Sequence, residues 1–123
     1  MNFLLVLVGG AVGSVARYGV GRLTLSAFGP NYPWGTLAVN LIGGFLMGVL
    51  VGTLARTSGS ENTRLLLGVG VLGGFTTFSA FSLDAVSMIE GGQWGAAIVY
   101  ALASVIGSVV ALFAGLYLIR AVA

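Results

Sequence analysis

Gly73-Gly74-Phe75-Thr76-Thr77-Phe78-Ser79 lies inside the third of four long apolar stretches in this sequence. Gly68 and Gly70 come shortly before it, so glycine crowds the first half of the stretch. Each glycine lowers the stability of a helix by about 1 kcal/mol relative to alanine. Inside a membrane, a helix can be broken only where the freed backbone is buried in protein or lines a cavity. We therefore expect a third helix that is broken at mid-membrane, near residues 73–77.

The composition around this segment indicates that lipid is its solvent. Of 123 residues, 58% are hydrophobic and 7% are charged, whereas a soluble domain carries about 25% charged residues. Cysteine and histidine are absent, which removes disulfides, the usual transition-metal ligands and the commonest general base. The five arginines are scattered along the chain, so there is no basic patch for nucleic acid. These features argue against an enzyme and against a nucleic-acid partner.

Four stretches are long enough to span a bilayer, which takes about 20 mostly apolar residues. We expect the spans at about residues 3–26, 34–54, 63–89 and 94–119. No connection between them could hold a soluble domain, so residues 1–123 are predicted to form a single four-span, all-α integral membrane domain. Trp34 and Trp94 fall near span ends, where aromatic belts lie. The expected location is the cell (inner) membrane, with the protein multi-pass and surrounded by lipid.

The charges in the connections hardly distinguish the two sides of the membrane. Four spans place both termini on one side, which collects Arg56, Arg64 and Arg120. The other side collects Arg22, and Arg17 if that residue reaches water. Orientation follows the excess of Lys and Arg in short loops, and this excess is small. We therefore expect both orientations in one membrane.

The second span carries a regular stripe of small and polar residues. Thr36, Asn40, Gly44, Gly48 and Gly52 recur every four residues, which keeps them on one helix face. Glycines at this spacing favour close helix contact, and helix packing alone would account for them. We also expect this face to join two copies of the chain into a dimer. Asn40 allows two interpretations, because a buried amide needs partners. It either makes a structural hydrogen bond to a neighbouring helix or belongs to a polar path.

Hydroxyl groups also recur every four residues along the fourth span, at Tyr100, Ser104 and Ser108. A serine in a helix commonly bonds to a carbonyl of its own helix. Three aligned hydroxyls could equally form a polar track along the helix. The sequence leaves these two interpretations open.

Three phenylalanines follow the expected break at intervals of three residues: Phe75, Phe78 and Phe81. Packing in an aromatic core is the ordinary interpretation of such a row. However, threonines and serines alternate with these rings, and an aromatic ring has a positive edge. A row of ring edges could therefore face an anion without offering it a competing charge.

Acidic residues are absent from the first, second and fourth spans. A proton-coupled pump normally needs an intramembrane carboxylate as its relay. Asp84, toward the end of the third span, could serve, although capping or pairing is the commoner role of an acid near a helix end. For Arg17 three roles stay open: pairing with Asp84, lining a vestibule, or snorkelling to the interface.

Three motifs, in this order, resemble the Fluc (CrcB) family of fluoride channels. They are Gly9-Gly10-Ala11-Val12-Gly13 with Arg17-Tyr18, then Gly35-Thr36-Leu37 with Val39-Asn40 and Gly43, then Gly73-Gly74-Phe75-Thr76-Thr77-Phe78-Ser79-Ala80-Phe81-Ser82. The resemblance covers all four spans, and the last motif is highly specific. Ala80 stands where the family commonly has Thr, and Asp84 where it commonly has Glu. These departures put only local packing in doubt.

The resemblance implies an antiparallel, dual-topology homodimer with two separate fluoride pores. It implies that Asn40, Phe78 and Phe81 line each pore, with further polar contacts from Thr36, Thr77, Tyr100 and Ser108. It also implies a structural sodium ion at the dimer interface, held by the backbone carbonyls of Gly73 and Thr76 from both subunits. Hard cations favour such oxygen ligands. No organic cofactor is implied.

The resemblance implies a passive, fluoride-selective channel that exports fluoride and relieves its toxicity. Uncharged HF crosses membranes and ionises in a near-neutral cytoplasm, where fluoride is trapped. An interior-negative potential then favours anion exit by about 2.3 kcal/mol per 100 mV. One alternative is a small multidrug-type, proton-coupled transporter, which would need an acid in the first span, where there is none. The other is a structural membrane subunit, which would leave the polar tracks unexplained.

Overall fold

The computed structural model describes residues 2–57 and 59–122, and its regular elements there are all helical. The elements are α1 (Asn2–Phe28), α2 (Trp34–Thr57), α3 (Glu61–Thr63), η1 (Arg64–Leu72), α4 (Gly73–Phe75), α5 (Ser79–Glu90) and α6 (Trp94–Val122). Four segments are long and apolar enough to cross a membrane: Asn2–Phe28, Trp34–Thr57, Glu61–Glu90 and Trp94–Val122. The prediction of an all-α protein with four apolar spans is confirmed.

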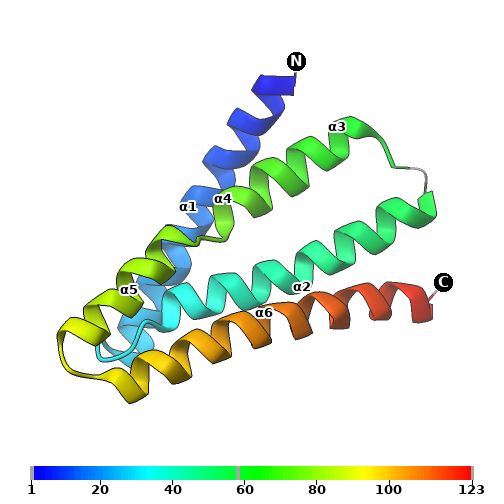
Figure 1. The fold of residues 1–123 in the computed structure, drawn as a ribbon. Helices are drawn as coiled ribbons and strands as arrows, with labels where there is room; N and C mark the ends of the chain where they lie inside the picture. The colour runs from blue at the N-terminus through cyan, green and yellow to red at the C-terminus, as the bar shows by residue number, and fades with distance from the viewer. Residues whose placement is uncertain (1, 58, 123) are drawn as a thin grey trace.

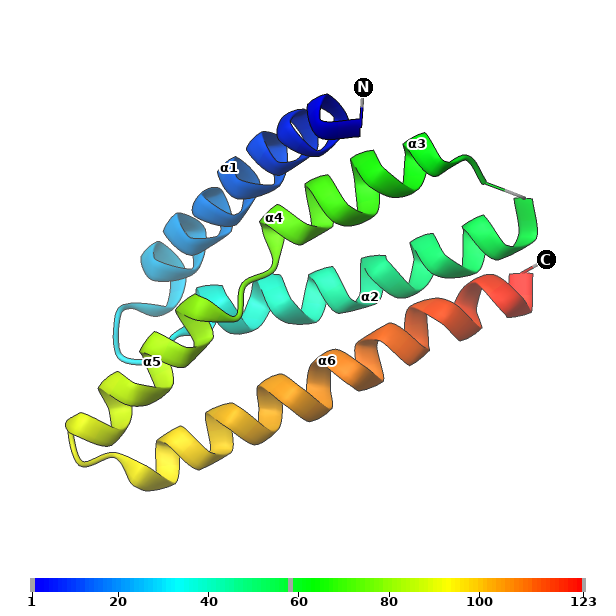
Figure 2. The ribbon, with the colours of Figure 1, turned by 45° about the horizontal axis from the view of Figure 1, so that its top comes forward.

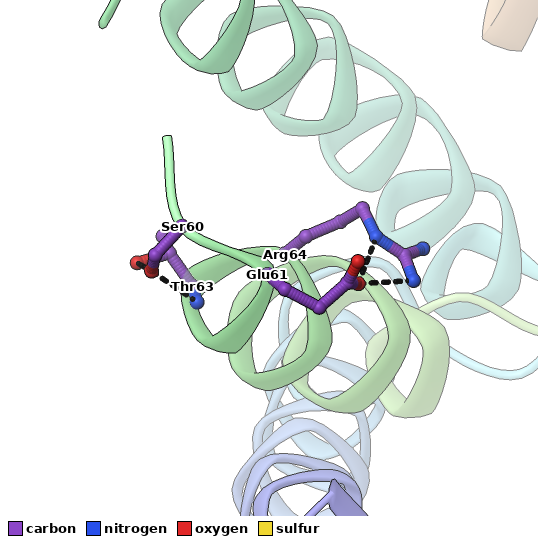
Figure 3. Close-up of polar contacts among 4 residues, drawn as sticks. All are labelled: Ser60, Glu61, Thr63 and Arg64. Atoms are coloured by element: carbon purple, nitrogen blue, oxygen red, sulfur yellow. Dashed lines mark hydrogen bonds and ion pairs between the residues drawn. The ribbon is translucent and has the colours of Figure 1, made fainter. Parts of the chain in front are cut away.

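Local signals in the sequence account for the connections between these segments. Gly29 and Gly92 have φ of 80° and 79°, a left-handed conformation that glycine adopts without steric cost. The Ser60 side chain accepts the backbone N–H of Thr63 at 3.1 Å and so caps the start of α3 (Figure 3).

The helices form a thin bundle in which α2 and α6 lie side by side and run in the same direction (Figures 1 and 2). The run from α3 to α4 packs mainly against α1. Both termini and the α2–α3 connection lie at one end of the molecule, and the α1–α2 and α5–α6 connections lie at the other. An even number of spans produces this arrangement.

The glycine stripe of α2 brings α6 of the same chain close. A Cβ atom added at Gly44 would lie 2.8 Å from the carbonyl oxygen of Ser108, and one at Gly48 would overlap the carbonyl of Leu112. Gly52 faces side chains of α6 instead of its backbone, and an added Cβ there would lie 3.0 Å from the Cβ of Ile119. The expectation that this stripe joins two subunits is therefore wrong, because the subunit's own fourth span already covers it.

Apolar side chains cover the outer faces of the helices. Phe3 is 93% exposed and Leu23 71% exposed, whereas Val39 and Tyr100 are the largest side chains among the described residues that are almost fully buried. A soluble protein rarely exposes such extensive apolar surface. Lipid, which solvates apolar groups, suits this surface.

The third apolar segment changes its backbone conformation along its length. Residues Arg64–Leu72 follow a wide π-helical pattern, which is rare and is often found at functional sites. Thr76 then adopts an extended conformation, with φ −85° and ψ 161°. Residues 76–78 lie outside any helix, and α5 begins at Ser79.

Candidate functional site

A cavity of about 580 Å³ opens beside the non-helical residues 76–78, between the middle of α2 and the middle of α6. It collects five of the residues for which a pore role was predicted: Asn40, Thr77, Phe78, Phe81 and Ser108. Gly44, Gly73 and Thr76 also line it. Residues that are up to 68 positions apart in the chain are thus brought to one hollow.

A second cavity, of about 320 Å³, lies between α1, the start of α2 and residues 77–80. Arg17, Arg22 and Thr36 line it, and none of the described residues that line it carries a carboxylate. Two guanidinium groups without an acid make this cavity attractive to anions. Thr77 lines both cavities and therefore lies between them.

Asn40 is tied to the non-helical segment by two hydrogen bonds. Its Nδ2 donates to the carbonyl oxygen of Thr77 at 3.0 Å, and its Oδ1 accepts the backbone N–H of Thr77 at 2.9 Å. The structural hydrogen bond considered from the sequence is therefore present. An amide group has two N–H donors, so one N–H of Asn40 is left over on a side chain that also lines the cavity. The two interpretations of Asn40 are compatible.

The side chains of Asn40 and Thr77 accept two backbone N–H groups that a continuous helix would bond to its own carbonyls. In an α-helix, N–H(i) bonds to the carbonyl of residue i−4, so Thr77 would donate to Gly73 and Ala80 would donate to Thr76. Instead Thr77 donates to Asn40 Oδ1, and Ala80 donates to Thr77 Oγ1 at 3.1 Å. The carbonyls of Gly73 and Thr76 thereby lose the donors that a continuous helix would supply.

Phe78 and Phe81 stand next to each other at the cavity, with ring centroids 5.6 Å apart. Phe78 is 77% exposed. Phe81 also packs against Tyr100, at 5.2 Å. Tyr100 itself is fully buried and donates its hydroxyl to Asp84 Oδ2 at 3.0 Å. Tyr100 is not among the residues that line either cavity, and Thr36 lines the second cavity instead of the first.

The two serines of α6 favour a polar track over bonds within their own helix. Ser108 Oγ donates to the Asn40 carbonyl of α2 at 3.4 Å. Ser104 Oγ is buried, lines the large cavity and has no hydrogen-bond partner among the described residues. Sequence reasoning placed Ser104 in the row of hydroxyls but not among the pore residues. Its four-residue spacing was the available signal, and its unpaired burial appears only in three dimensions.

Arg17 takes a different partner from the acid considered for it. Its Nε donates to the carbonyl oxygen of Gly74 at 3.1 Å, while Asp84 accepts from Tyr100. The ion pair present in the described part of the chain joins Arg64 to Glu61 at the far end of the molecule (Figure 3). Pairing of Arg17 with Asp84 is therefore not observed, and Arg17 lines the second cavity as a vestibule residue would.

Side chains offer little to a metal ion here. Within residues 2–57 and 59–122, no group of three or more His, Cys, Asp or Glu side chains could hold one. A cation near this site would depend on neutral oxygens. The carbonyls of Gly73 and Thr76 are oxygens of that kind.

Comparison with known proteins adds independent information. The sequence profile described as "CrcB-like protein, Camphor Resistance (CrcB)" matches residues 4–116. A protein of Novosphingobium aromaticivorans named "Fluoride-specific ion channel FluC" is 53% identical over 120 residues, which cover 96% of this chain and 95% of that protein. Proteins of the same name from Agrobacterium fabrum and Phenylobacterium zucineum are 56% and 57% identical over 121 residues. These matches cover 98% and 97% of this chain, and 97% and 95% of the two relatives. The resemblance carried by the three motifs is confirmed, and the protein belongs to the CrcB family.

Proposed function

We propose that this protein is a passive, fluoride-selective channel of the inner membrane, and not an enzyme. The cavity beside residues 76–78 carries the proposal, because it places the Asn40 amide and the hydroxyls of Ser104 and Ser108 next to two aromatic rings. The names of its relatives, fluoride-specific ion channels, point the same way.

Fluoride is small and strongly hydrated, so its desolvation is costly unless other donors replace water. The arginine-lined cavity would attract the anion, and Thr77 lines both that cavity and the larger one. There the spare N–H of Asn40, the serine hydroxyls and the positive ring edges of Phe78 and Phe81 can face it. Export follows from the interior-negative potential without ATP or a proton relay.

We further infer that the working unit is an antiparallel homodimer of dual topology. Residues 76–78 lie about halfway along Glu61–Glu90, which supports a break at mid-membrane. Phe78 and Gly73 are exposed in the single chain, so a second subunit would close the open side of the cavity. A structural sodium ion at the subunit interface would be held by the carbonyls of Gly73 and Thr76, which lack their helical donors and are neutral oxygens as such a cation prefers.

The test is fluoride efflux from liposomes that contain only the purified protein, with a potassium ionophore to set the potential and chloride as the comparison anion. Fluoride should leave at a rate that follows the potential, and chloride should stay inside. Efflux that requires a pH gradient would indicate a coupled transporter. Fluoride retained as in protein-free liposomes would indicate a structural subunit and overturn the proposal.

A further inference from the structure

Two side chains of the large cavity hold the third segment in its non-helical path. We propose that Asn40 and Thr77 are positioning residues for a cation, because their side chains take the backbone donors that would otherwise occupy the carbonyls of Gly73 and Thr76. This inference rests on the sodium ion of the proposed function. It concerns how the chain creates the two oxygens and not the ion itself.

The first donor to be redirected is the backbone N–H of Thr77. In a continuous helix it would bond to the carbonyl of Gly73. Here it donates to Asn40 Oδ1 at 2.9 Å, and the same amide returns a hydrogen bond from Nδ2 to the Thr77 carbonyl at 3.0 Å. One amide side chain from α2 therefore satisfies both backbone groups of Thr77, and the carbonyl of Gly73 is left without its helical partner.

The second donor is the backbone N–H of Ala80. Its helical acceptor would be the carbonyl of Thr76, but it donates to Thr77 Oγ1 at 3.1 Å. The N-cap residue of α5 is Phe78, whose side chain makes no capping hydrogen bond. Thr77, one residue before it, therefore satisfies a first-turn N–H of α5 that has no partner within the helix. At Thr76, ψ of 161° turns the carbonyl away from the helical direction.

Gly73 is exposed in the single chain, but at a subunit interface in lipid its carbonyl would find no water, and a carbonyl without a donor there is costly. A cation is one of the few partners that can compensate two such carbonyls together. The carbonyls of Gly73 and Thr76 are available because the side chains of Asn40 and Thr77 have replaced them as hydrogen-bond acceptors. The same two side chains line the large cavity, and Thr77 also lines the arginine-lined one. A change at either position should therefore act on the cation site as well as on the ion path.

The experiment measures thermal stability of the purified dimer in detergent as sodium replaces N-methylglucamine, with no fluoride present. Thr77→Val keeps the shape of the side chain and removes the acceptor, so Ala80 is free to donate to Thr76. Substitutions of groups that orient metal ligands typically cost about 10–100-fold in affinity, and we expect Thr77→Val to raise the half-stabilising sodium concentration by at least about tenfold. Thr77→Ser restores the hydroxyl and should restore the parent response.

Two further variants make the result specific. Thr53→Val is the matched control, because the Thr53 hydroxyl bonds to a carbonyl of its own helix, that of Val49; its sodium response should equal that of the parent. Asn40→Leu removes the acceptor and should weaken the response as Thr77→Val does, and it serves alone if Thr77→Val does not fold.

The outcomes separate this inference from the proposed function. If the parent is stabilised by sodium and Thr77→Val and Asn40→Leu respond to it equally well, the side chains do not create the site and the inference is overturned. If sodium does not raise the thermal stability of the parent while the parent still conducts fluoride, both the cation site and the inference are wrong, and the proposed channel function is unaffected. Loss of fluoride efflux from the parent would instead remove the proposed function.

Discussion

Asn40 and Thr77 exchange two hydrogen bonds across 37 residues of sequence. The amide of a helical residue thereby pairs with the backbone of a non-helical one, as a neighbouring strand would. Because the pairing uses one of the two Nδ2 hydrogens, the amide can hold the segment in place and still face the cavity. This double role makes Asn40 the most informative position for mutation.

Asn40→Asp should abolish fluoride conduction while the dimer still assembles. A carboxylate about 4 Å from fluoride repels it by roughly 4 kcal/mol at an effective dielectric of 20, which reduces occupancy about a thousandfold. The measurement is initial fluoride efflux per folded dimer from liposomes. Asn62→Asp makes the same chemical change at an exposed position of α3 and should conduct like the parent. Efflux near the parent rate in Asn40→Asp would show that the anion path lies elsewhere.

Phe78→Ile and Phe81→Ile should both slow fluoride severely without admitting chloride. Isoleucine keeps the bulk but lacks the positive ring edge, and aromatic contacts of this kind are worth about 1 kcal/mol, so efflux should fall by about fivefold. The two variants should differ in stability. Phe81 packs on buried Tyr100, whereas Phe78 is largely exposed in the subunit. Phe3→Ile, at a 93% exposed ring, is the control, and an equal loss there would contradict a role for the ring edges.

Gly48→Ala should destabilise the subunit. The added Cβ would overlap the Leu112 carbonyl of α6, and overpacking of this kind costs about 1–3 kcal/mol. Gly19→Ala is the matched change, since nothing lies within 4 Å of its added Cβ. It should leave stability unchanged or raise it by up to about 1 kcal/mol. Reversible unfolding in mixed micelles compares the two. Equal stability of both variants would mean that α2 and α6 do not pack as closely as the structure has them.

Gly73→Leu should act between subunits and not within one. In the single chain, a Cβ at Gly73 meets only the Gly68 carbonyl, at an ordinary 3.6 Å, whereas a Cβ at Gly74 would lie 2.8 Å from the Gly10 carbonyl. We expect Gly73→Leu to yield a folded subunit with weakened dimerisation, and Gly74→Ala to lower the stability of the subunit itself. Mass measurement in detergent gives the assembly, and unfolding gives the stability. A fully dimeric Gly73→Leu protein that sodium still stabilises would place the interface elsewhere.

Dual topology can be tested by labelling, because the sequence contains no cysteine. Thr57→Cys and Gln93→Cys place thiols at opposite ends of the molecule, both at exposed positions. If both orientations coexist, a membrane-impermeant reagent applied from one side should label each variant only in part. Complete labelling of one and none of the other would establish a single orientation.

The amino-acid sequence was sufficient to predict that the protein lies in lipid, that its fold is all-α and to which family it belongs. A chain with 58% hydrophobic and 7% charged residues can satisfy its backbone in lipid only as helices or closed barrels, and the four long apolar stretches indicated helices. Glycine enrichment also pointed to the region around residue 73. Those features depend on composition and local propensity, which are properties of short stretches.

Pairing between distant residues came from the three-dimensional arrangement alone. The spacing of Gly44, Gly48 and Gly52 predicted close helix contact but could not name the partner, because any helix backbone fits against such a stripe. Tyr100 was predicted to line the cavity, but in the structure it is buried and its hydroxyl donates to Asp84. The pair of hydrogen bonds between Asn40 and Thr77 likewise has no signature in the spacing of residues. Which side chain replaces a helical carbonyl as acceptor depends on how α2 lies against the third segment.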